Sequence, residues 1–380
     1  MLALQLTKLF LSNYRNYDHL ALSFHADLIC FIGSNAQGKT NILESIFLSC
    51  TGRSHRTPRD RELIQWGKDE AFIRTKVNKQ LGASEIAIGL SNTEKKKILI
   101  NQSPATRMGE LMGHLNSVMF SPEDLKLVRE GPQERRRFMD IELSQVKPKY
   151  FYNLQQYNRV LNQRNRLLKE IPYKPFLMNT LPVWDKQLAE AGSYIIMQRR
   201  FFCDALQTIA EKIHKHITHG AEELSVVYKS SIPFNKDTAS QEEIQGNFLK
   251  ELERKHKDDT ERGTTSRGCH RDDMVFQING IDVRTFGSQG QKRTTVLSLK
   301  LSELEFMAQE TGEYPLLLLD DAMSELDFSR QKMILKYVDK VQTFITLTDL
   351  DQIPALKGKS RQVFEINSGK ALPIESNPFN

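Results

Sequence analysis

One stretch of the chain combines glycines, a lysine and a threonine at a spacing that suits phosphate binding. It reads GSNAQGKT and fits the pattern G-x-x-x-x-G-K-[ST]. Glycines permit a tight loop whose backbone N–H groups converge on phosphate oxygens. Lys39 would then reach the β- and γ-phosphates of ATP, and Thr40 would be a ligand of Mg²⁺. The predicted nucleotide-binding residues of this loop are Gly33, Ser34, Asn35, Ala36, Gln37, Gly38, Lys39 and Thr40.

A second chemical signal, YPLLLLDDAM, lies far downstream. The run Leu316–Leu319 predicts a strand that is buried on both faces. Asp320 falls at the carboxyl end of that strand, where a second Mg²⁺-linked group is needed, and Asp321 is placed to orient or deprotonate an attacking water. The predicted catalytic residues are Asp321, Asp320 and Lys39, and the predicted Mg²⁺ ligands are Thr40 and Asp320.

A third signal, SQGQ at Ser288–Gln291, stands in a turn directly before a predicted helix. A helix N-terminus binds anions, so Ser288, Gly290 and Gln291 are further candidates for nucleotide binding. One nucleotide could use both sites only if the fold brought them together, or if two copies of the chain faced each other. The alternative is a capped surface helix in which Ser288 is a plain capping residue.

Hydrophobic periodicity predicts the elements that position these residues. Period-two alternation in the opening segment predicts strands, followed by a strand at Leu28–Ile32 and a helix from Lys39 to about Ser49. The segment 85–102 predicts a hairpin, and LNSVMF predicts a short strand. Further predicted elements are a helix over Gln289–Gln309, a helix near Arg330–Asp339, and strands over Thr343–Leu347 and near Gln362–Ile366.

After about residue 120 the hydrophobic periodicity becomes that of helices rather than strands. Two long amphipathic segments, 132–170 and 181–220, predict an inserted helical hairpin, and Pro172, Pro175 and Pro182 break the chain around the junction between them. We therefore predict an α/β fold with three consecutive parts. They are a first ATPase segment over 1–120, a helical insertion over 121–265, and a completing segment over 266–380 that carries the SQGQ turn and the two aspartates.

Composition limits the class of protein. The 380 residues carry a formal net charge of +6, which mildly favours a polyanionic partner. Four cysteines form no C-x-x-C pair, which suggests free thiols in a reducing cytoplasm. We expect no signal peptide and no membrane span, because no apolar run approaches the roughly 20 residues that crossing a bilayer requires.

Basic residues offer candidate contacts to DNA phosphates, although a solvated face is the competing interpretation. Phosphate contacts give affinity without base specificity. Arg135, Arg136 and Arg137 are adjacent in a predicted helix. Neighbouring side chains on a helix point about 100° apart, so at most two of the three can contact one surface. The segment His270–Asp273 suggests a metal site, but neighbouring strand residues alternate faces, which favours a structural role or one at the edge of the nucleotide. The DNA candidates are Arg53, Arg56, Arg59, Arg135 and Arg136, with Arg164, Arg166, Arg199 and Arg200 on the hairpin.

Taken together, the motifs resemble an ABC-type ATPase head of the SMC branch, in which a helical segment emerges between two halves of the head. Within that branch the chain resembles the RecF family of bacterial recombination mediators. The resemblance rests on LSNYRNY, GSNAQGKTNILESI, GRSHRTPRDRELI, FSPEDLKLVREGPQERRRFMD, RGCHRDD, FGSQGQKRT and LLLLDDAMSELD.

The resemblance implies an ATP-dependent homodimer with Mg²⁺. Each ATP would lie on Gly33–Thr40 of one copy and under Ser288–Gln291 of the other, with the D-loop Ser324–Asp327 along the seam. It also implies a cytoplasmic clamp on single-stranded or double-stranded DNA at gaps, which hydrolyses ATP slowly. The clamp would act with RecR and RecO and help to load RecA in recombinational repair, replication restart and the SOS response.

Three positions depart from the usual pattern of ABC-type enzymes. Asp321 stands where most have glutamate, Thr348-Asp349 where a histidine is usual, and Ser121–Asp124 where a glutamine loop is usual. Other classes remain open: the ATPase subunit of a transporter or of another SMC-like assembly, and a small-molecule kinase. The basic charge and the helical insertion argue against a transporter subunit, and the SQGQ turn has no role in a kinase.

Overall fold

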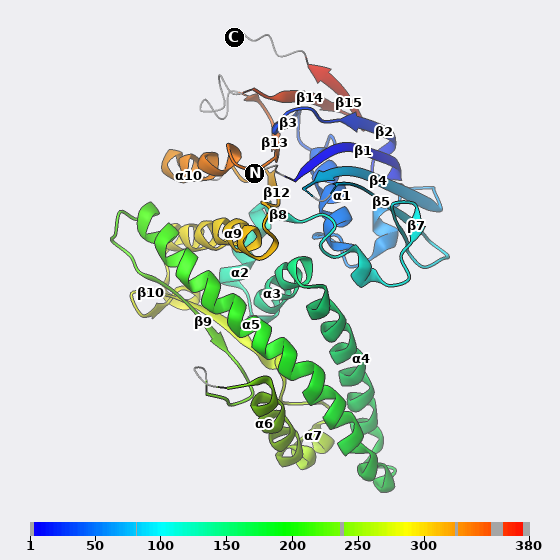
Figure 1. Ribbon diagram of the computed structural model, residues 1–380, viewed down its shortest axis with the longest axis vertical. Helices are drawn as coiled ribbons and strands as arrows, with labels where there is room; N and C mark the ends of the chain where they lie inside the picture. The colour runs from blue at the N-terminus through cyan, green and yellow to red at the C-terminus, as the bar shows by residue number, and fades with distance from the viewer. Residues whose placement is uncertain (1–3, 81, 236–238, 324–325, 351–359, 375–380) are drawn as a thin grey trace. The chain divides into compact units, whose positions relative to one another are not determined.

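The computed structural model describes residues 4–80, 82–235, 239–323, 326–350 and 360–374 (Figure 1). The chain forms two compact units. Unit 1 consists of Met1–Leu125, His216–His219 and Val296–Asn380, and unit 2 of Lys126–Lys215 and Gly220–Thr295. The second boundary differs from the predicted one at 265/266, because strand β10 (Asp273–Ile278) pairs with β9 (Leu224–Lys229) and remains in unit 2.

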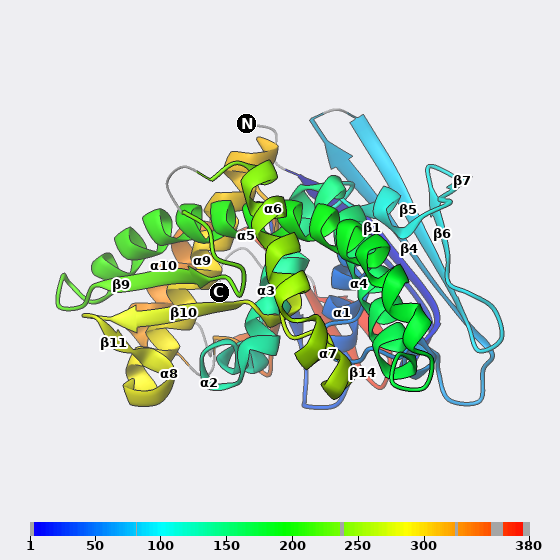
Figure 2. The same cartoon turned by 90° about the horizontal axis from the view of Figure 1, so that it is seen from below.

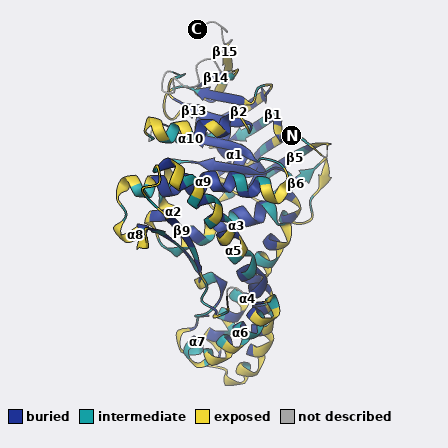
Figure 3. Cartoon of the chain, turned by 60° about the vertical axis from the view of Figure 1, so that its left-hand side comes forward, coloured by how far each residue is buried: buried dark blue, intermediate teal, exposed yellow. Residues whose placement is uncertain are grey.

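The core of unit 1 is a six-stranded sheet in the order β15-β14-β3-β13-β12-β8. All its pairs are parallel except β14 with β15. β8, β12 and β13 are buried along their whole length, as expected for strands inside a parallel sheet, and Figure 3 shows this for β13. The strands are β3 (Leu28–Ile32), β8 (Ser117–Phe120), β12 (Leu316–Asp320), β13 (Thr343–Leu347), β14 (Gln362–Asn367) and β15 (Lys370–Ile374).

A second, antiparallel sheet of unit 1 has the order β2-β1-β4-β5-β6-β7. Its strands are β1 (Gln5–Tyr14), β2 (Tyr17–Ser23), β4 (Glu70–Lys79), β5 (Gly82–Ser91), β6 (Lys97–Ile100) and β7 (Ser103–Pro104). Helix α1 (Lys39–Thr51) contacts strands of both sheets, which explains why it is buried on nearly every side rather than along one stripe. The helix that begins at the phosphate loop is therefore held between two sheets.

The remaining elements of unit 1 are short or peripheral. They are the 3-10 helices η1 (Asp60–Leu63), η2 (Met108–Leu111) and η3 (Pro122–Leu125), helix α10 (Phe328–Val338), and most of α9 (Gln289–Thr311), whose first residues belong to unit 2.

Unit 2 contains the predicted helical hairpin, formed by α4 (Pro148–Glu170) and α5 (Leu181–Ile217) (Figure 1). A three-stranded antiparallel sheet, β11-β10-β9, lies beside α5 (Figure 2). The other elements of the unit are α2 (Lys126–Arg129), α3 (Pro132–Val146), η4 (Pro175–Thr180), α6 (Gln241–Arg254), α7 (His256–Arg262), η5 (Cys269–Arg271), β11 (Ile281–Asp282) and α8 (Val283–Phe286).

Most predicted elements are present at the predicted places, and the strand over Thr343–Leu347 has the predicted bounds. β4 and β15 have no counterpart among the predicted elements. All four cysteines are buried free thiols. Within the described ranges, no helix has the length and apolar character that spanning a membrane requires.

Candidate nucleotide site

The phosphate loop connects β3 to α1, as the sequence predicts, and the two glycines of the G-x-x-x-x-G-K-[ST] pattern adopt backbone angles that other residues rarely adopt. Gly33 has φ 145° and Gly38 has φ 116°. A Cβ atom on Gly33 would lie 2.4 Å from the carbonyl oxygen of Ile366, and one on Gly38 would meet the side chains of Asn16 and Tyr17. The pattern therefore requires glycine here both for conformation and for space.

Two segments distant in the sequence support this loop. The Tyr17 hydroxyl donates to the carbonyl oxygen of Gly38 at 3.1 Å, and the Asn16 amide donates to that of Gln37 at 2.9 Å. On the other side, the backbone N–H of Ser368 donates to Oε1 of Gln37 at 2.7 Å. The LSNYRNY segment and the turn between β14 and β15 thus hold the loop in shape, a role that the sequence analysis did not assign to either.

Lys39 points back into the loop. Its ammonium donates to the carbonyl oxygens of Gly33 at 2.5 Å and Ser34 at 2.8 Å. Burial lowers the pKa of Lys39, and the nearby carboxylates of Asp321 and Asp320 oppose that shift. A desolvated cation is therefore already placed where a bound phosphate would compensate its charge.

Thr40 and Asp320 meet although they are far apart in the sequence. The Thr40 hydroxyl donates to Oδ1 of Asp320 at 2.8 Å, and the Thr346 hydroxyl donates to the same oxygen at 3.0 Å. Thr346 lies opposite Asp320 in the β12–β13 pair and also accepts a hydrogen bond from the Asp321 N–H at 2.9 Å. Burial raises the pKa of Asp320, and the two hydroxyl groups oppose that shift. Thr346 is a positioning residue that the sequence analysis missed.

The donor set fits Mg²⁺. Mg²⁺ is usually bound through one or two carboxylates together with substrate phosphates and water, rather than by a complete protein cage. Thr40 and Asp320 supply a hydroxyl and a carboxylate at hydrogen-bonding distance. Among the residues that the structure describes, no cluster of three or more His, Cys, Asp or Glu side chains could hold a metal.

These residues line a cavity of about 310 Å³ in unit 1. Asp321 is exposed at its wall and has φ 50°, in the left-handed region. Thr348, at the position where a histidine is usual, also lines it. The lining residues are Asn35, Ala36, Gly38, Lys39, Thr40, Asn41, Arg56, Asp320, Asp321, Thr346, Leu347 and Thr348.

Arg56 is predicted as a DNA contact, and the structure places it at this cavity. Its guanidinium donates to Oδ1 of Asn41 at 3.0 Å and lies 3.7 Å from the Glu44 carboxylate. Burial would raise the pKa of Glu44, but hydrogen bonds from Arg15 and Ser54 outweigh it and hold the pKa below its usual value. An ionised Glu44 therefore holds Arg56 beside the candidate nucleotide site. The run of basic residues around Arg56 does not by itself indicate this position.

The other basic candidates divide by exposure. Arg53 is exposed, and so is Arg59, whose side chain is 65% exposed. Arg135 is buried and forms a two-pronged pair with Asp273 at 2.7 and 3.0 Å, so its prediction as a DNA contact is corrected. Arg136 is partly buried and donates to the Asp272 carbonyl oxygen at 2.7 Å. Among the hairpin arginines, Arg164 and Arg199 are also buried in ion pairs.

The RGCHRDD segment is part of the polar core of unit 2. The His270 ring contacts the Tyr157 hydroxyl at 2.7 Å, and burial lowers its pKa to about 4. Asp272 accepts hydrogen bonds from the Tyr228 hydroxyl and the Ser231 N–H, while Asp273 pairs with Arg135. The side chains have different partners and do not converge on one ion. Strand alternation is not the reason, because Cys269–Arg271 is the 3-10 helix η5 and the strand β10 begins only at Asp273.

The SQGQ turn caps helix α9. The Ser288 hydroxyl accepts from the Gln291 N–H at 3.1 Å, and Oε1 of Gln291 accepts from the Ser288 N–H at 2.9 Å. Ser288 and Gly290 are exposed, so the capped turn still presents its surface to solvent. The turn belongs to unit 2 and the phosphate loop to unit 1. In the predicted D-loop, Ser324 and Glu325 lie outside the described residues.

The chain has the fold of an SMC-like ATPase head. A parallel sheet carries a phosphate loop after one strand and a carboxylate at the end of another, and a helical unit is inserted between these two parts of the sequence. A sequence model described as RecF/RecN/SMC N terminal domain matches residues 5–356. The chain belongs to the RecF family.

Individual relatives support this assignment. The DNA replication and repair protein RecF of Alkaliphilus oremlandii (strain OhILAs) is 49% identical over 360 residues, which are 95% of this chain and 98% of the relative. RecF of Clostridium botulinum (strain ATCC 19397 / Type A) is 44% identical over 361 residues, 95% of this chain and 97% of the relative. A solved structure of the recombination mediator protein RecF with ATP in the RecFOR pathway is similar with a TM-score of 0.92 and 36% identity, covering 98% of each chain.

The fold extends to more distant heads. The Smc head domain of Pyrococcus furiosus, solved bound to the C-terminal domain of ScpA, is similar with a TM-score of 0.55 and 15% identity, over 98% of this chain and 96% of that one. That identity supports the fold alone.

Proposed function

We propose that the chain is an ATP-driven DNA clamp that acts in DNA replication and repair. The observation that carries the proposal is the hydrogen bond from Thr40 to Asp320 beside the buried Lys39 ammonium. It brings together a phosphate loop and a strand-end carboxylate from opposite parts of the chain, which is the arrangement that Mg²⁺-ATP requires.

Each residue has a distinct role in this proposal. Lys39 compensates the charge of the β- and γ-phosphates, and the loop N–H groups bind their oxygens. Thr40 and Asp320 hold Mg²⁺, which supplies charge neutralisation at the phosphates when it is bound. Asp321 orients or deprotonates the attacking water. Aspartate is one methylene shorter than the usual glutamate, which is consistent with slow hydrolysis that acts as a switch.

The proposed active form is a dimer in which Ser288, Gly290 and Gln291 of one copy contact the ATP held by the other. Support comes from the exposed start of α9, where the positive end of the helix dipole faces solvent. Two phosphate-binding turns in one chain are then both used, each on a different nucleotide.

The proposed partner of the dimer is DNA, at junctions or gaps between single-stranded and double-stranded segments. Exposed arginines such as Arg53 and Arg59 suit phosphate contacts. By family membership we propose that the clamp is cytoplasmic, works with RecR and RecO, and helps to load RecA.

An ATP-dependent gel shift with gapped DNA tests the proposal. We expect retarded DNA with Mg²⁺-ATP, and none without nucleotide or with Lys39→Ala. Retardation that is independent of ATP, or its persistence in Lys39→Ala, would refute an ATP-driven clamp.

A further inference from the structure

The end of the helical hairpin carries aromatic rings that the protein does not bury. We call residues 172–183, between α4 and the second turn of α5, the hairpin tip. Tyr173 is 86% exposed and Phe176 is 69% exposed, and Val183, in the first turn of α5, is 59% exposed. Large apolar side chains grouped in this way on a surface mark a binding site more often than chance exposure does.

The fold of the tip does not need these rings. Beneath them Leu168, Ile171 and Leu181 form a small buried cluster, against which Leu177 packs. Backbone hydrogen bonds, such as that from the Leu177 N–H to the Lys174 carbonyl oxygen at 3.0 Å, close the turns. The tip is therefore an ordered structure with its own apolar core, and the rings stand outside that core.

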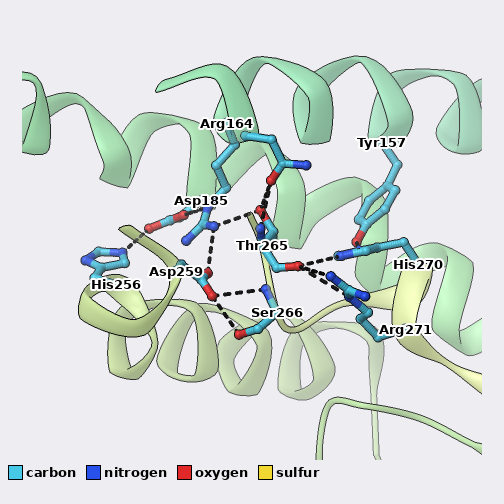
Figure 4. Close-up of polar contacts among 10 residues, drawn as sticks. Tyr157, Arg164, Asp185, His256, Asp259, Thr265, Ser266, His270 and Arg271 are labelled. Atoms are coloured by element: carbon cyan, nitrogen blue, oxygen red, sulfur yellow. Dashed lines mark hydrogen bonds and ion pairs between the residues drawn. The ribbon is translucent and has the colours of Figure 1, made fainter. Parts of the chain in front are cut away.

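A buried polar network fixes the helices behind the tip (Figure 4). Arg164 of α4 donates to Asp185 of α5 at 2.7 Å and to Asp259 of α7 at 2.8 Å, and all three side chains are almost completely buried. His256 of α7 lies 2.6 Å from the other Asp185 oxygen. Three helices are thus cross-linked near their ends, so the rings are presented on a pre-organised support, which reduces the entropy lost on binding.

The charge around the rings selects the class of partner. Lys169, Lys174 and Lys186 are exposed at the tip and the adjoining helix turns. The nearby Glu170 carboxylate is matched by Lys174 at 3.9 Å, which leaves a positive excess. Ammonium groups interleaved with exposed rings suit single-stranded nucleic acid, whose unstacked bases can lie on aromatic side chains while its phosphates meet the cations. In duplex DNA the bases are already stacked on one another.

We propose that the hairpin tip binds single-stranded DNA, with bases stacked on Tyr173 and Phe176 and phosphates held by the three lysines. This proposal rests on the proposed DNA-binding function and adds a second, separate contact to it. It gives the chain a way to distinguish a gap from a continuous duplex, because only a gap offers unpaired bases.

Binding of a fluorescent oligo-dT strand, measured by anisotropy on the full chain, tests the proposal. Because a stacked base contributes on the order of a tenfold change in affinity, we expect Tyr173→Ala and Phe176→Ala each to weaken binding roughly tenfold and Tyr173→Phe to retain it. Tyr152→Ala, which removes an exposed ring from the same hairpin away from the tip, is the matched control and should bind as the wild type does. ATP-dependent retention of duplex DNA should not change in any of the three alanine variants.

Two further measurements locate the contact. Lys174→Gln should reduce the slope of log affinity against log salt by about 0.7, the value for one phosphate contact to a single strand. A dT strand containing 5-iododeoxyuridine should cross-link on irradiation to the peptide that contains Tyr173 and Phe176.

The outcomes separate this proposal from the proposed function. Unchanged oligo-dT affinity in the double variant Tyr173→Ala/Phe176→Ala, or equal losses for oligo-dT and duplex, would overturn the tip as a single-strand site. So would binding of the tip to vesicles of anionic phospholipid with no effect of the double variant on oligo-dT. Wild-type protein that binds neither oligo-dT nor duplex with ATP would instead refute the proposed function.

Discussion

Replacing Asp320 with asparagine should make the nucleotide-free protein more stable while removing its ability to use Mg²⁺-ATP. Burial is the main reason that the pKa of Asp320 is raised, and the neighbouring Asp321 charge acts in the same direction. A raised pKa means that the folded protein as a whole disfavours the ionised form. Asparagine is nearly the same size and carries no charge, so Asp320→Asn relieves this penalty.

The hydrogen bonds around the residue should survive the change. Thr40 and Thr346 both donate to Oδ1, and the amide oxygen of asparagine can accept both. We therefore expect a gain of about 1 kcal/mol, within the usual range of stabilising substitutions. In a unit of this size that gain corresponds to a rise in Tm of about 2–4 °C.

Mg²⁺-ATP should reverse the order of stability. A ligand present at a hundredfold excess over its Kd stabilises the protein that binds it by about 2.7 kcal/mol. The wild type should gain this amount, whereas Asp320→Asn, lacking the carboxylate for Mg²⁺, should gain little. Thermal unfolding of both proteins with and without Mg²⁺-ATP measures all four values.

The sign of the pH dependence follows from the raised pKa. The stability that comes from protonating Asp320 is fully present below the unfolded value, about 3.9, and is lost as pH rises through the higher folded pKa. The advantage of Asp320→Asn should therefore be largest at neutral pH and shrink as the pH falls through the raised folded pKa of Asp320. Asp321→Asn is the control: that side chain is exposed, and asparagine tolerates its positive φ, so nucleotide-free stability should stay within about 0.5 kcal/mol. A nucleotide-free Asp320→Asn protein that melts below the wild type would refute the reasoning.

Four further variants test separate parts of the mechanism. Lys39→Ala should abolish tight binding of a fluorescent ATP analogue, and unchanged affinity would contradict the role of the phosphate loop. Asp321→Asn should still bind ATP but cleave it more slowly, so that the dimer persists on DNA in single-turnover assays; normal cleavage would exclude this carboxylate from catalysis. Ser288→Arg should leave ATP binding by the monomer nearly intact but block dimerisation in sedimentation with ATP, and a dimer as stable as the wild type would reduce Ser288 to a helix cap. Arg59→Ala should lower the salt slope of duplex DNA binding by roughly 0.9, and an unchanged slope would remove it from the interface.

Local signals were enough to predict the strand–loop–helix conformation of the phosphate loop, because its key pattern is contiguous. The glycines, Lys39 and Thr40 lie in one strand–loop–helix segment, and their conformations are determined mainly by neighbours in the sequence. Thr346 could not be found in this way, since its contact with Asp320 depends on the register of β12 against β13. β4 was within reach of sequence reasoning, because Ile73, Thr75 and Val77 alternate with the polar residues Arg74, Lys76 and Asn78 as in a half-buried strand.

The burial of the basic residues could not be predicted from the sequence. Helical geometry predicts that the side chains of Arg135 and Arg136 diverge, and they do, but it cannot say which of them points inward. Burial of Arg135 depends on Asp273, which arrives from a strand late in the chain. A buried arginine and a surface arginine look the same in a sequence until the partner carboxylate is placed.

The strand that carries the phosphate loop has consequences for how the protein is made. Both neighbours of β3 in the sheet, β13 and β14, come from near the C-terminal end of the sequence, and Gly33 packs directly against Ile366 of β14. During synthesis the loop and α1 leave the ribosome long before these strands do. The nucleotide site can therefore form only after translation has passed residue 367, and a nascent chain, or a product truncated before β13, would lack both neighbours of β3. In such incomplete chains the phosphate loop would also lack its support from the turn between β14 and β15.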